Sequence, residues 1–269
     1  MRVRDFGPFD DPVVLFGGPY SNLAALEALS RIIGERRAIC TGDVVAYCAD
    51  PVATVNLMQA MAVECIAGNC ERQVAEGAID CGCGFETGST CDRLSRGWYS
   101  FLSSACSPDA ISWLADQPEL GVFTQKGRRY AIIHGGVTNI SRFIWPDSPE
   151  DVFVEEINEL EKLLGRIDGV VAGHSGIAFH RRIGRHQWIN AGVIGLPPHD
   201  GRPDTRYAVL SDGDVVIERL QYDHVATRQA MRAAGLTQGY QETITTGIWP
   251  SEDVLPASLR RHTPDFANG

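Results

Sequence analysis

Four side chains of metal-ligand type stand beside glycines, each close behind a short apolar segment that is typical of a buried strand. The ends of strands are where α/β proteins collect the groups of an active site. A carboxylate, an amide and two imidazoles offer the mixed oxygen and nitrogen ligands that suit Mn, Fe or Zn. Each residue alone is equally consistent with a turn or a satisfied core side chain, but the ordered set of four predicts one metal site. Its members are Asp43 after Gly42, Asn69 after Gly68, His134 before Gly135 and His174 after Gly173.

The segments expected to position these groups alternate between short β-rich runs and amphipathic helical patterns. Apolar residues recur at helical spacing in the segments that we expect to form helices, and Ser21 or Asn22 is placed to cap the first of them. The expected helices are 23–33, 51–61 and 150–164. The expected strands are 13–16, 38–40, 63–67, 121–124, 130–134, 169–172, 207–210 and 215–220, the last two joined at Asp212-Gly213.

This order of elements predicts a mixed sheet system covered by helices, because helix-separated strands come first and antiparallel strands follow. Within the 269 residues no repeat or low-complexity linker marks a boundary, so we expect a single domain over 1–269. A Cys- and Gly-rich segment at about 77–92 reads as an inserted loop. From about residue 224 we expect one helix followed by a proline-containing tail.

Composition excludes some partners. The formal net charge is −10, from 34 acidic and 24 basic residues, which argues against binding to nucleic acid or to an anionic membrane. No apolar run is long enough to span a bilayer, and the first residues contain no apolar signal-peptide core. We therefore expect a cytoplasmic protein whose eight cysteines are reduced thiols or metal ligands rather than disulfides.

The ordered motifs resemble those of the calcineurin-like metallophosphoesterase family, in which D-x-H-G-N, G-D, G-N-H-D or G-N-C-D, H-G and G-H-T-H follow one another. The corresponding runs here are Gly42-Asp43, Gly68-Asn69-Cys70-Glu71, His134-Gly135 and Gly173-His174-Ser175, with 189–195 similar to the family's N-P-G-S-x-G stretch. The similarity covers most of residues 13–223. It implies an α/β fold of four layers, an α/β/β/α sandwich built on two mixed sheets.

The resemblance also implies roles for individual residues. The metal-binding positions of the family are occupied here by Asp43, Asn69, His134 and His174. The resemblance also implies a catalytic role for Asp43, Asn69 and His174. Cys70 stands where many members have the histidine that helps to protonate the leaving group.

Three family ligands are replaced, and all three belong to the same metal of the usual pair. Gly18 stands in place of an aspartate, Tyr20 in place of a histidine, and Gly176 in place of a second histidine. The resemblance therefore implies one divalent transition metal per chain, held at the retained site.

Two hypotheses address what fills the vacated half. The segment of Gly18, Tyr20, Ser21 and Asn22 precedes a helix and could hold a phosphate through backbone N–H groups, or it could be only a tight turn. Sulfur from Cys81, Cys83 and Cys91 could bind metal, although free thiols in a glycine-rich loop are the better interpretation because their spacing is no standard zinc pattern.

The function predicted from these patterns is metal-dependent hydrolysis of a phosphate ester or anhydride, by metal-activated water acting on a small phosphorylated substrate. One alternative is a non-catalytic relative that binds a phosphorylated ligand or a protein partner. Another is a thiolate-containing metal site with different chemistry. The sequence does not specify an oligomeric state.

Overall fold

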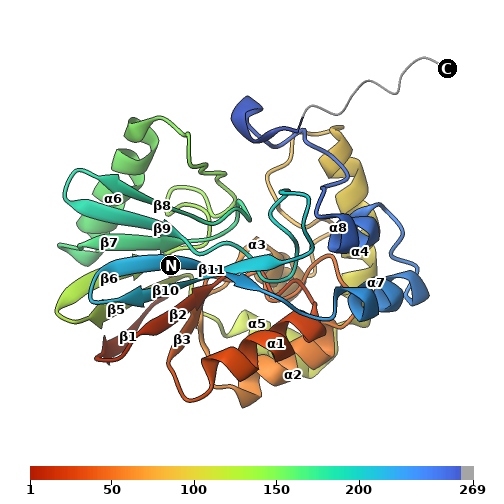
Figure 1. The fold of residues 1–269 in the computed structure, drawn as a ribbon, viewed down its shortest axis with the longest axis horizontal. Helices are drawn as coiled ribbons and strands as arrows, with labels where there is room; N and C mark the ends of the chain where they lie inside the picture. Colours follow the sequence, from red (N-terminus) through yellow and green to blue (C-terminus); the bar gives the residue numbers. More distant parts are fainter. Residues whose placement is uncertain (262–269) are drawn as a thin grey trace.

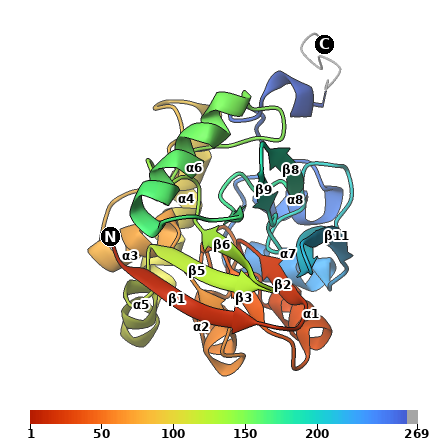
Figure 2. The same ribbon diagram turned by 90° about the vertical axis from the view of Figure 1, so that its left-hand side faces the viewer.

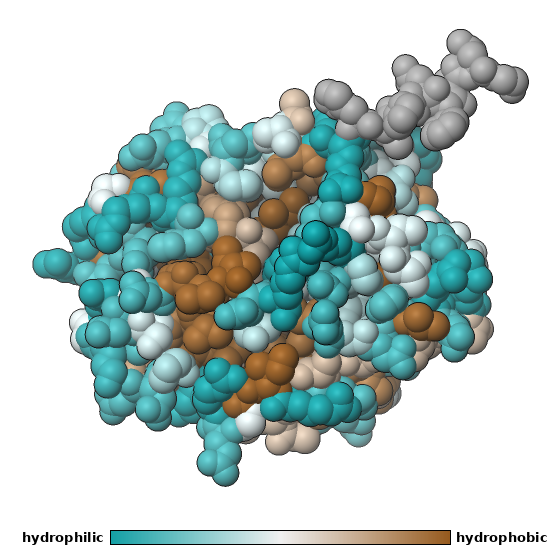
Figure 3. Space-filling view, viewed as in Figure 1, coloured by the Kyte–Doolittle hydropathy of each residue, from teal (hydrophilic) through white to brown (hydrophobic). Residues whose placement is uncertain are grey.

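The computed structural model describes residues 1–261 and shows two β-sheets packed face to face, with helices outside both (Figures 1 and 2). This arrangement confirms the predicted α/β/β/α sandwich. In the described part of the chain, no helix combines the length and the apolar character needed to cross a bilayer. On the face in Figure 3, hydrophilic residues dominate the periphery and hydrophobic residues gather toward the middle.

The first sheet has five strands in the order β11-β10-β2-β3-β4. These are β11 (Asp214–Leu220), β10 (Thr205–Ser211), β2 (Val13–Phe16), β3 (Ala38–Cys40) and β4 (Glu64–Cys65). Strands β2, β3 and β4 run parallel, whereas β10 pairs antiparallel with both β2 and β11. The predicted hairpin at Asp212-Gly213 is confirmed, because Ser211 pairs with Asp214 across it.

The second sheet has six strands in the order β1-β5-β6-β7-β9-β8 and is also mixed. These are β1 (Val3–Phe9), β5 (Leu120–Gln125), β6 (Arg128–Ile132), β7 (Gly169–Ala172), β9 (His186–Asn190) and β8 (Phe179–Ile183). Strands β6, β7 and β9 are parallel neighbours, so their carboxyl ends meet at one edge of the sheet.

Alternation along β2 explains how the layers are held together. All four of its residues are fully buried, because both faces of the strand are covered. Val13 and Leu15 point into the cluster between the two sheets, whereas Val14 and Phe16 point into the cluster beneath the helices. A strand buried on both faces has to be a continuous apolar run, which is why it was readable from the sequence.

Seven helices cover the outer face of the five-stranded sheet and contribute to one large hydrophobic cluster within the described residues. They are α1 (Leu23–Ile33), α2 (Pro51–Ala60), α3 (Asn69–Glu76), α4 (Thr90–Ala105), α5 (Pro108–Ala115), α7 (His224–Ala233) and α8 (Tyr240–Thr246). Helix α6 (Glu150–Leu164) covers the outer face of the other sheet, where Phe153 and Leu160 pack on Trp188 and its neighbours. A 3₁₀ turn follows at Ala257–Leu259.

The expectation of one helix after Asp223 is wrong. Gly235, with a positive φ of 77°, follows the end of α7, and a second helix, α8, begins after Gly239. The last part of the predicted tail, residues 262–269, lies outside the described residues. The Cys- and Gly-rich segment is also shorter than expected, because α4 begins at Thr90 with the Ser89 hydroxyl accepting from the Asp92 N–H.

The expectation that the cysteines are thiols or metal ligands rather than disulfides is wrong for one pair. Cys81 and Cys83 form a disulfide, brought together by the turn at Gly82, whose φ is 60°. Cys91 and the other cysteines are free, and most of them are buried. The structure therefore offers no thiolate cluster from this loop.

Candidate metal centre

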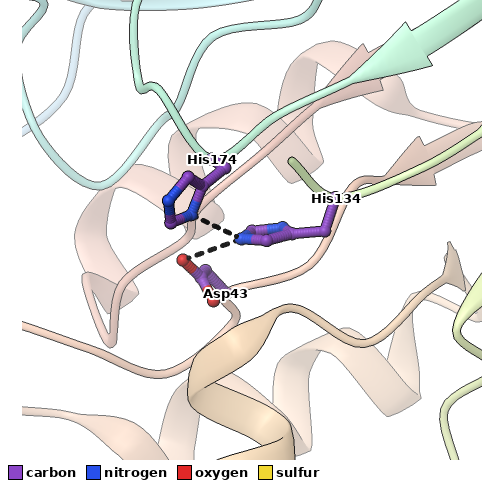
Figure 4. A group of neighbouring side chains, drawn as sticks. All are labelled: Asp43, His134 and His174. Carbon is purple, nitrogen blue, oxygen red and sulfur yellow. Dashed lines mark hydrogen bonds and ion pairs between the residues drawn. The ribbon is translucent and has the colours of Figure 1, made fainter. Parts of the chain in front are cut away.

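The four predicted ligands converge at the carboxyl ends of strands from both sheets. Asp43 follows β3, Asn69 is the first residue of α3 just beyond β4, His134 follows β6, and His174 follows β7. Asp43, His134 and His174 point toward one another, and their nearest ligand atoms all lie within 4.8 Å of each other (Figure 4). All four residues are buried.

The Nε2 atom of His134 lies at the middle of the group. It is 3.3 Å from Asp43 Oδ2, 3.0 Å from Asn69 Oδ1 and 3.1 Å from His174 Nδ1. Neighbouring ligands of one ion, bound at about 2.0–2.2 Å, are separated by similar distances. The spacing of these atoms therefore fits a shared transition-metal ion.

The tautomer of His134 strengthens this conclusion. Its Nδ1 is 2.6 Å from the carbonyl oxygen of Thr41, which can only accept, so Nδ1 carries a proton. In neutral His134 the Nε2 lone pair then faces oxygen lone pairs of Asp43 and Asn69. Converging lone pairs repel unless a proton or a metal cation lies among them.

The charges around the group favour binding of a cation. Burial raises the pKa of Asp43, but His134 outweighs burial and keeps the pKa below its usual value. Burial lowers the pKa of His134, yet the charge of Asp43 raises it overall. Burial, followed by the charge of His134, lowers the pKa of His174 to about 3, so this imidazole is neutral and free to act as a ligand.

The Cys81–Cys83 loop orients Asn69. The amide nitrogen of Asn69 donates to the carbonyl oxygen of Cys81 at 2.8 Å. Its carbonyl oxygen is thereby turned toward His134 Nε2. The loop thus selects which end of the amide faces the metal position, a supporting role of the kind that second partners play around metal ligands.

Two of the flanking glycines permit the close approach of the strand ends. A Cβ atom on Gly68 would overlap the carboxylate of Asp43, and one on Gly173 would overlap the side chain of Thr41. Asp43 and His174 themselves adopt positive φ angles of 55° and 59°, a conformation that costs free energy in residues with a Cβ and persists where the surroundings enforce it.

Glu71 is a supporting residue to which the sequence reading gave no role. Its carboxylate accepts from the N–H groups of Asp43 at 2.6 Å and Gly68 at 2.7 Å. It also accepts from Val45 at 3.3 Å. The signal was available, because a glutamate at the third position of a helix commonly reaches back to the N-cap N–H. Burial and the charge of Asp43 raise the pKa of Glu71 to about 7.

Cys70 lies against the Asp43 carboxylate, whose Oδ1 accepts from the backbone N–H of Cys70 at 3.2 Å. The thiol is only 1% exposed. Burial and then the charges of Asp43 and Glu71 raise its pKa well above the usual value, so it stays protonated. It therefore lies close to the proposed ligands, as its place in the family-like motif implied, but its burial gives no path to a leaving group.

The segment from Gly18 to Asn22 lies beside the proposed ligands, but its backbone N–H groups are already paired with carbonyl groups of the chain. The N–H groups of Gly18, Tyr20 and Ser21 donate to carbonyls of residues 42–44, and that of Asn22 donates to Pro19. The Asn22 side chain caps α1 and donates to Gly195. Of the two hypotheses for this segment, the paired donors favour the tight turn over phosphate binding by backbone N–H groups, and the Tyr20 side chain lines a pocket instead.

That pocket contains residues that the sequence reading missed. Asp43 and His174 form part of its lining, together with Tyr47, Phe143, Tyr240 and Trp249. Tyr240 and Trp249 come from the segment after residue 223, beyond the family-like motifs, so no motif drew attention to them.

Comparisons with known proteins agree with this architecture. No family model and no curated protein sequence matches the chain. Among solved structures, a metallophosphoesterase from Sphaerobacter thermophilus is 18% identical, with a TM-score of 0.70 over 89% of this chain and 100% of that one. A hypothetical protein from Pyrococcus horikoshii OT3 is 15% identical, with a TM-score of 0.74 over 88% of this chain and 98% of that one. Over most of its length, the chain has the metallophosphoesterase fold that its motifs predicted.

Proposed function

We propose that this protein is a metal-dependent phosphoesterase that hydrolyses a phosphate ester or anhydride, with one divalent transition metal held by Asp43, Asn69, His134 and His174. The observation that carries the proposal is the convergence of ligand atoms of Asp43, Asn69 and His174 on His134 Nε2. A bound ion would polarise a phosphoryl oxygen and make water more acidic, the two requirements for attack on phosphorus.

The chain's own residues prepare the site for such chemistry. Thr41 fixes the ring of His134, and the Cys81 carbonyl fixes the amide of Asn69, so two ligands are pre-oriented. Asp43 and His174 reach both the ligand group and the lining of the pocket, where a substrate would enter. An aromatic-lined site whose polar side chains are buried would strengthen charge interactions with a phosphate.

The proposal is tested by metal content and hydrolysis together. The protein is loaded with Mn, Fe or Zn, its bound metal is quantified, and its activity is measured on generic aryl phosphate monoesters and diesters. We expect about one metal per chain, and loss of both metal and activity in Asp43→Ala and His174→Ala. His180→Ala is the matched control, because this histidine lies exposed on β8.

Two results would count against the proposal. Activity in Asp43→Ala equal to that of the parent would place the reaction elsewhere. One metal per chain without hydrolysis of any ester would favour the non-catalytic alternative, a protein that binds a phosphorylated ligand.

A further inference from the structure

We propose that the site selects esters with a single phosphate and a hydrophobic ring on the leaving alcohol, and that the ring sits in the aromatic pocket beside Asp43 and His174. This inference rests on the proposed function and narrows its substrate class. The pocket is partly open to solvent, and residues from widely separated parts of the chain, between Tyr20 and Val254, line it. Its aromatic lining consists of Tyr20, Tyr47, Phe85, Phe143, Tyr240 and Trp249.

The aromatic walls stand where the sequence lacks the second set of metal ligands. A Cβ atom on Gly18 would lie 2.6 Å from the Tyr20 ring, so the ring already fills that position. A Cβ atom on Gly176 would lie 3.6 Å from the six-membered ring of Trp249. Both glycine positions therefore face aromatic carbon rather than another polar ligand.

The walls are held in place by their own contacts. The rings of Tyr20 and Tyr47 are 4.8 Å apart between centroids, and those of Tyr47 and Tyr240 are 4.6 Å apart. The ring of Phe143 lies 4.4 Å from that of the proposed ligand His174. Rings that pack on one another at these distances form fixed apolar walls, against which a planar apolar group can pack offset or edge-to-face.

Trp249 is fixed at both its backbone and its ring. Its backbone N–H donates to His199 Nδ1 at 2.8 Å, and its indole N–H donates to the Pro197 carbonyl at 2.7 Å. With its polar atom satisfied, the remaining carbon edge is free to contact a ligand. The C-terminal segment thus supplies a rigid apolar wall.

The charge of the pocket argues against polyphosphates. Among the described residues that line it there is no lysine or arginine, and Asp43 is its only carboxylate. A chain of several phosphates would need cationic side chains or further metal ions to offset its charge. The pocket has the proposed metal ligands Asp43 and His174 at one side and aromatic rings at the other. A substrate with one phosphate and an apolar ring matches both.

The test compares two stable phosphonates that differ only in the group at issue. Binding of phenylphosphonate and methylphosphonate to the metal-loaded protein is measured by calorimetry, with pyrophosphate as the polyanionic probe. We expect phenylphosphonate to bind at least about tenfold more tightly than methylphosphonate, and pyrophosphate to gain nothing over methylphosphonate.

Substitutions in the aromatic lining test whether it causes the preference for phenylphosphonate. Trp249→Ala is expected to remove most of the phenyl preference, because it should weaken phenylphosphonate binding far more than methylphosphonate binding. Phe85→Ala serves as a second variant in case the first fails to fold, because Phe85 lies in a loop rather than in a helix or strand. Trp113→Ala on α5 makes the same change of size outside the pocket and should keep the preference.

Equal affinity for the two phosphonates in a metal-loaded parent would overturn this inference and leave the proposed function standing. So would a phenyl preference that survives in both pocket variants. Failure of the protein to retain any metal would instead overturn the proposed function, and this inference with it.

Discussion

The backbone N–H of Asp43, a residue with a positive φ, donates to the carboxylate of Glu71. Glu71, in the first turn of α3, accepts hydrogen bonds from the N–H groups of Asp43 and Gly68. These two bonds connect the loop that carries Asp43 to the loop that precedes Asn69. A buried carboxylate with these partners is a positioning residue rather than a ligand, because it lies on the backbone side of Asp43. Asp43, the proposed carboxylate ligand, is thus held through its backbone by the side chain of Glu71.

Replacement of Glu71 by glutamine should weaken both the fold and metal binding. An amide presents only one acceptor oxygen, so at least one buried N–H loses its partner, which costs about 1–3 kcal/mol of unfolding free energy. Loss of support for a ligand typically reduces metal affinity by about 10–100-fold. Denaturant unfolding and metal titration measure the two effects. Glu76→Gln, at the exposed end of the same helix, should change neither.

The same variant should alter the pH dependence of the metal-free protein. The folded Glu71 keeps its proton up to about pH 7, whereas in the unfolded chain it releases the proton near its ordinary pKa of roughly 4.3. Since the folded state binds more protons between these values, this group makes stability fall as pH rises through that window. The stability deficit of Glu71→Gln should therefore be larger at pH 5 than at pH 7. A deficit independent of pH would contradict the assignment.

Restoring the three replaced family ligands should not rebuild a second metal site. Gly18 and Gly176 have positive φ angles of 39° and 77°, which cost residues with a Cβ roughly 1–2 kcal/mol each. A Cβ on Gly18 would also lie 2.7 Å from Val193. The combined Gly18→Asp, Tyr20→His and Gly176→His variant should melt at lower temperature and still bind one metal. Two metals per chain at an unchanged melting temperature would show that this reasoning is wrong.

The four predicted ligands could be identified from the sequence because each stands beside a glycine near the end of a recognisable strand. The four predicted ligands lie together in the structure because each follows a strand end, and the strand pattern was clear. The aromatic pocket was not predictable in the same way. Trp249 and Phe85 are far apart in the sequence and share no spacing, so only the folded chain reveals that they line one cavity.

Elements with two buried faces or a strong amphipathic pattern were predicted with correct bounds, as α6 illustrates. Helix α3 was not predicted, because it has only eight residues, most of them polar, and includes the site residues Asn69 and Cys70. The helix pair α7 and α8 was read as one because the break between them is set by two glycines at positive φ. The position of this break depends on where the chain must turn for α8 to pack against α7.

Helix α6 holds the loop that follows His134. Glu156 is fully buried, and it accepts from the N–H groups of Val137 and Thr138 and pairs with Arg142 at 2.6 Å. One carboxylate on a core-facing helix position thus satisfies two backbone donors and a cation in the segment between β6 and Phe143. The loop carries one wall of the pocket, so its position affects the site.

Glu156→Ala should destabilise the protein by about 2–4 kcal/mol, because it leaves the N–H groups of Val137 and Thr138 without their acceptor, whereas Arg142 keeps its pair with Glu155. Glu159→Ala on the same helix breaks only the exposed pair with Lys162 and should cost less than about 1 kcal/mol. Chemical denaturation of the two variants measures the contrast. Similar small losses for both would mean that water replaces the Glu156 contacts.

At the scale of the whole molecule, the four proposed metal ligands lie where the two sheets meet. Asp43 and Asn69 follow strands of the five-stranded sheet, whereas His134 and His174 follow strands of the six-stranded one. A shared ion would therefore connect both halves of the sandwich. The order of the motifs in the sequence predicted the ligands but not this connection, because sheet membership depends on long-range pairing such as that of β1 with β5.

A ligand that binds only the folded state stabilises it in proportion to its affinity and concentration. At a free metal concentration about 100 times the dissociation constant, the gain is about 2.7 kcal/mol. For a chain of 269 residues this corresponds to a rise in melting temperature of roughly 5–10 °C. We expect that shift in the parent and in His180→Ala, reversed by a chelator, and absent in Asp43→Ala and His174→Ala. Because the ligands come from both sheets, the shift should appear as a single cooperative transition when secondary structure and tryptophan fluorescence are followed together. An equal shift in Asp43→Ala would mean that the metal stabilises the protein from another site.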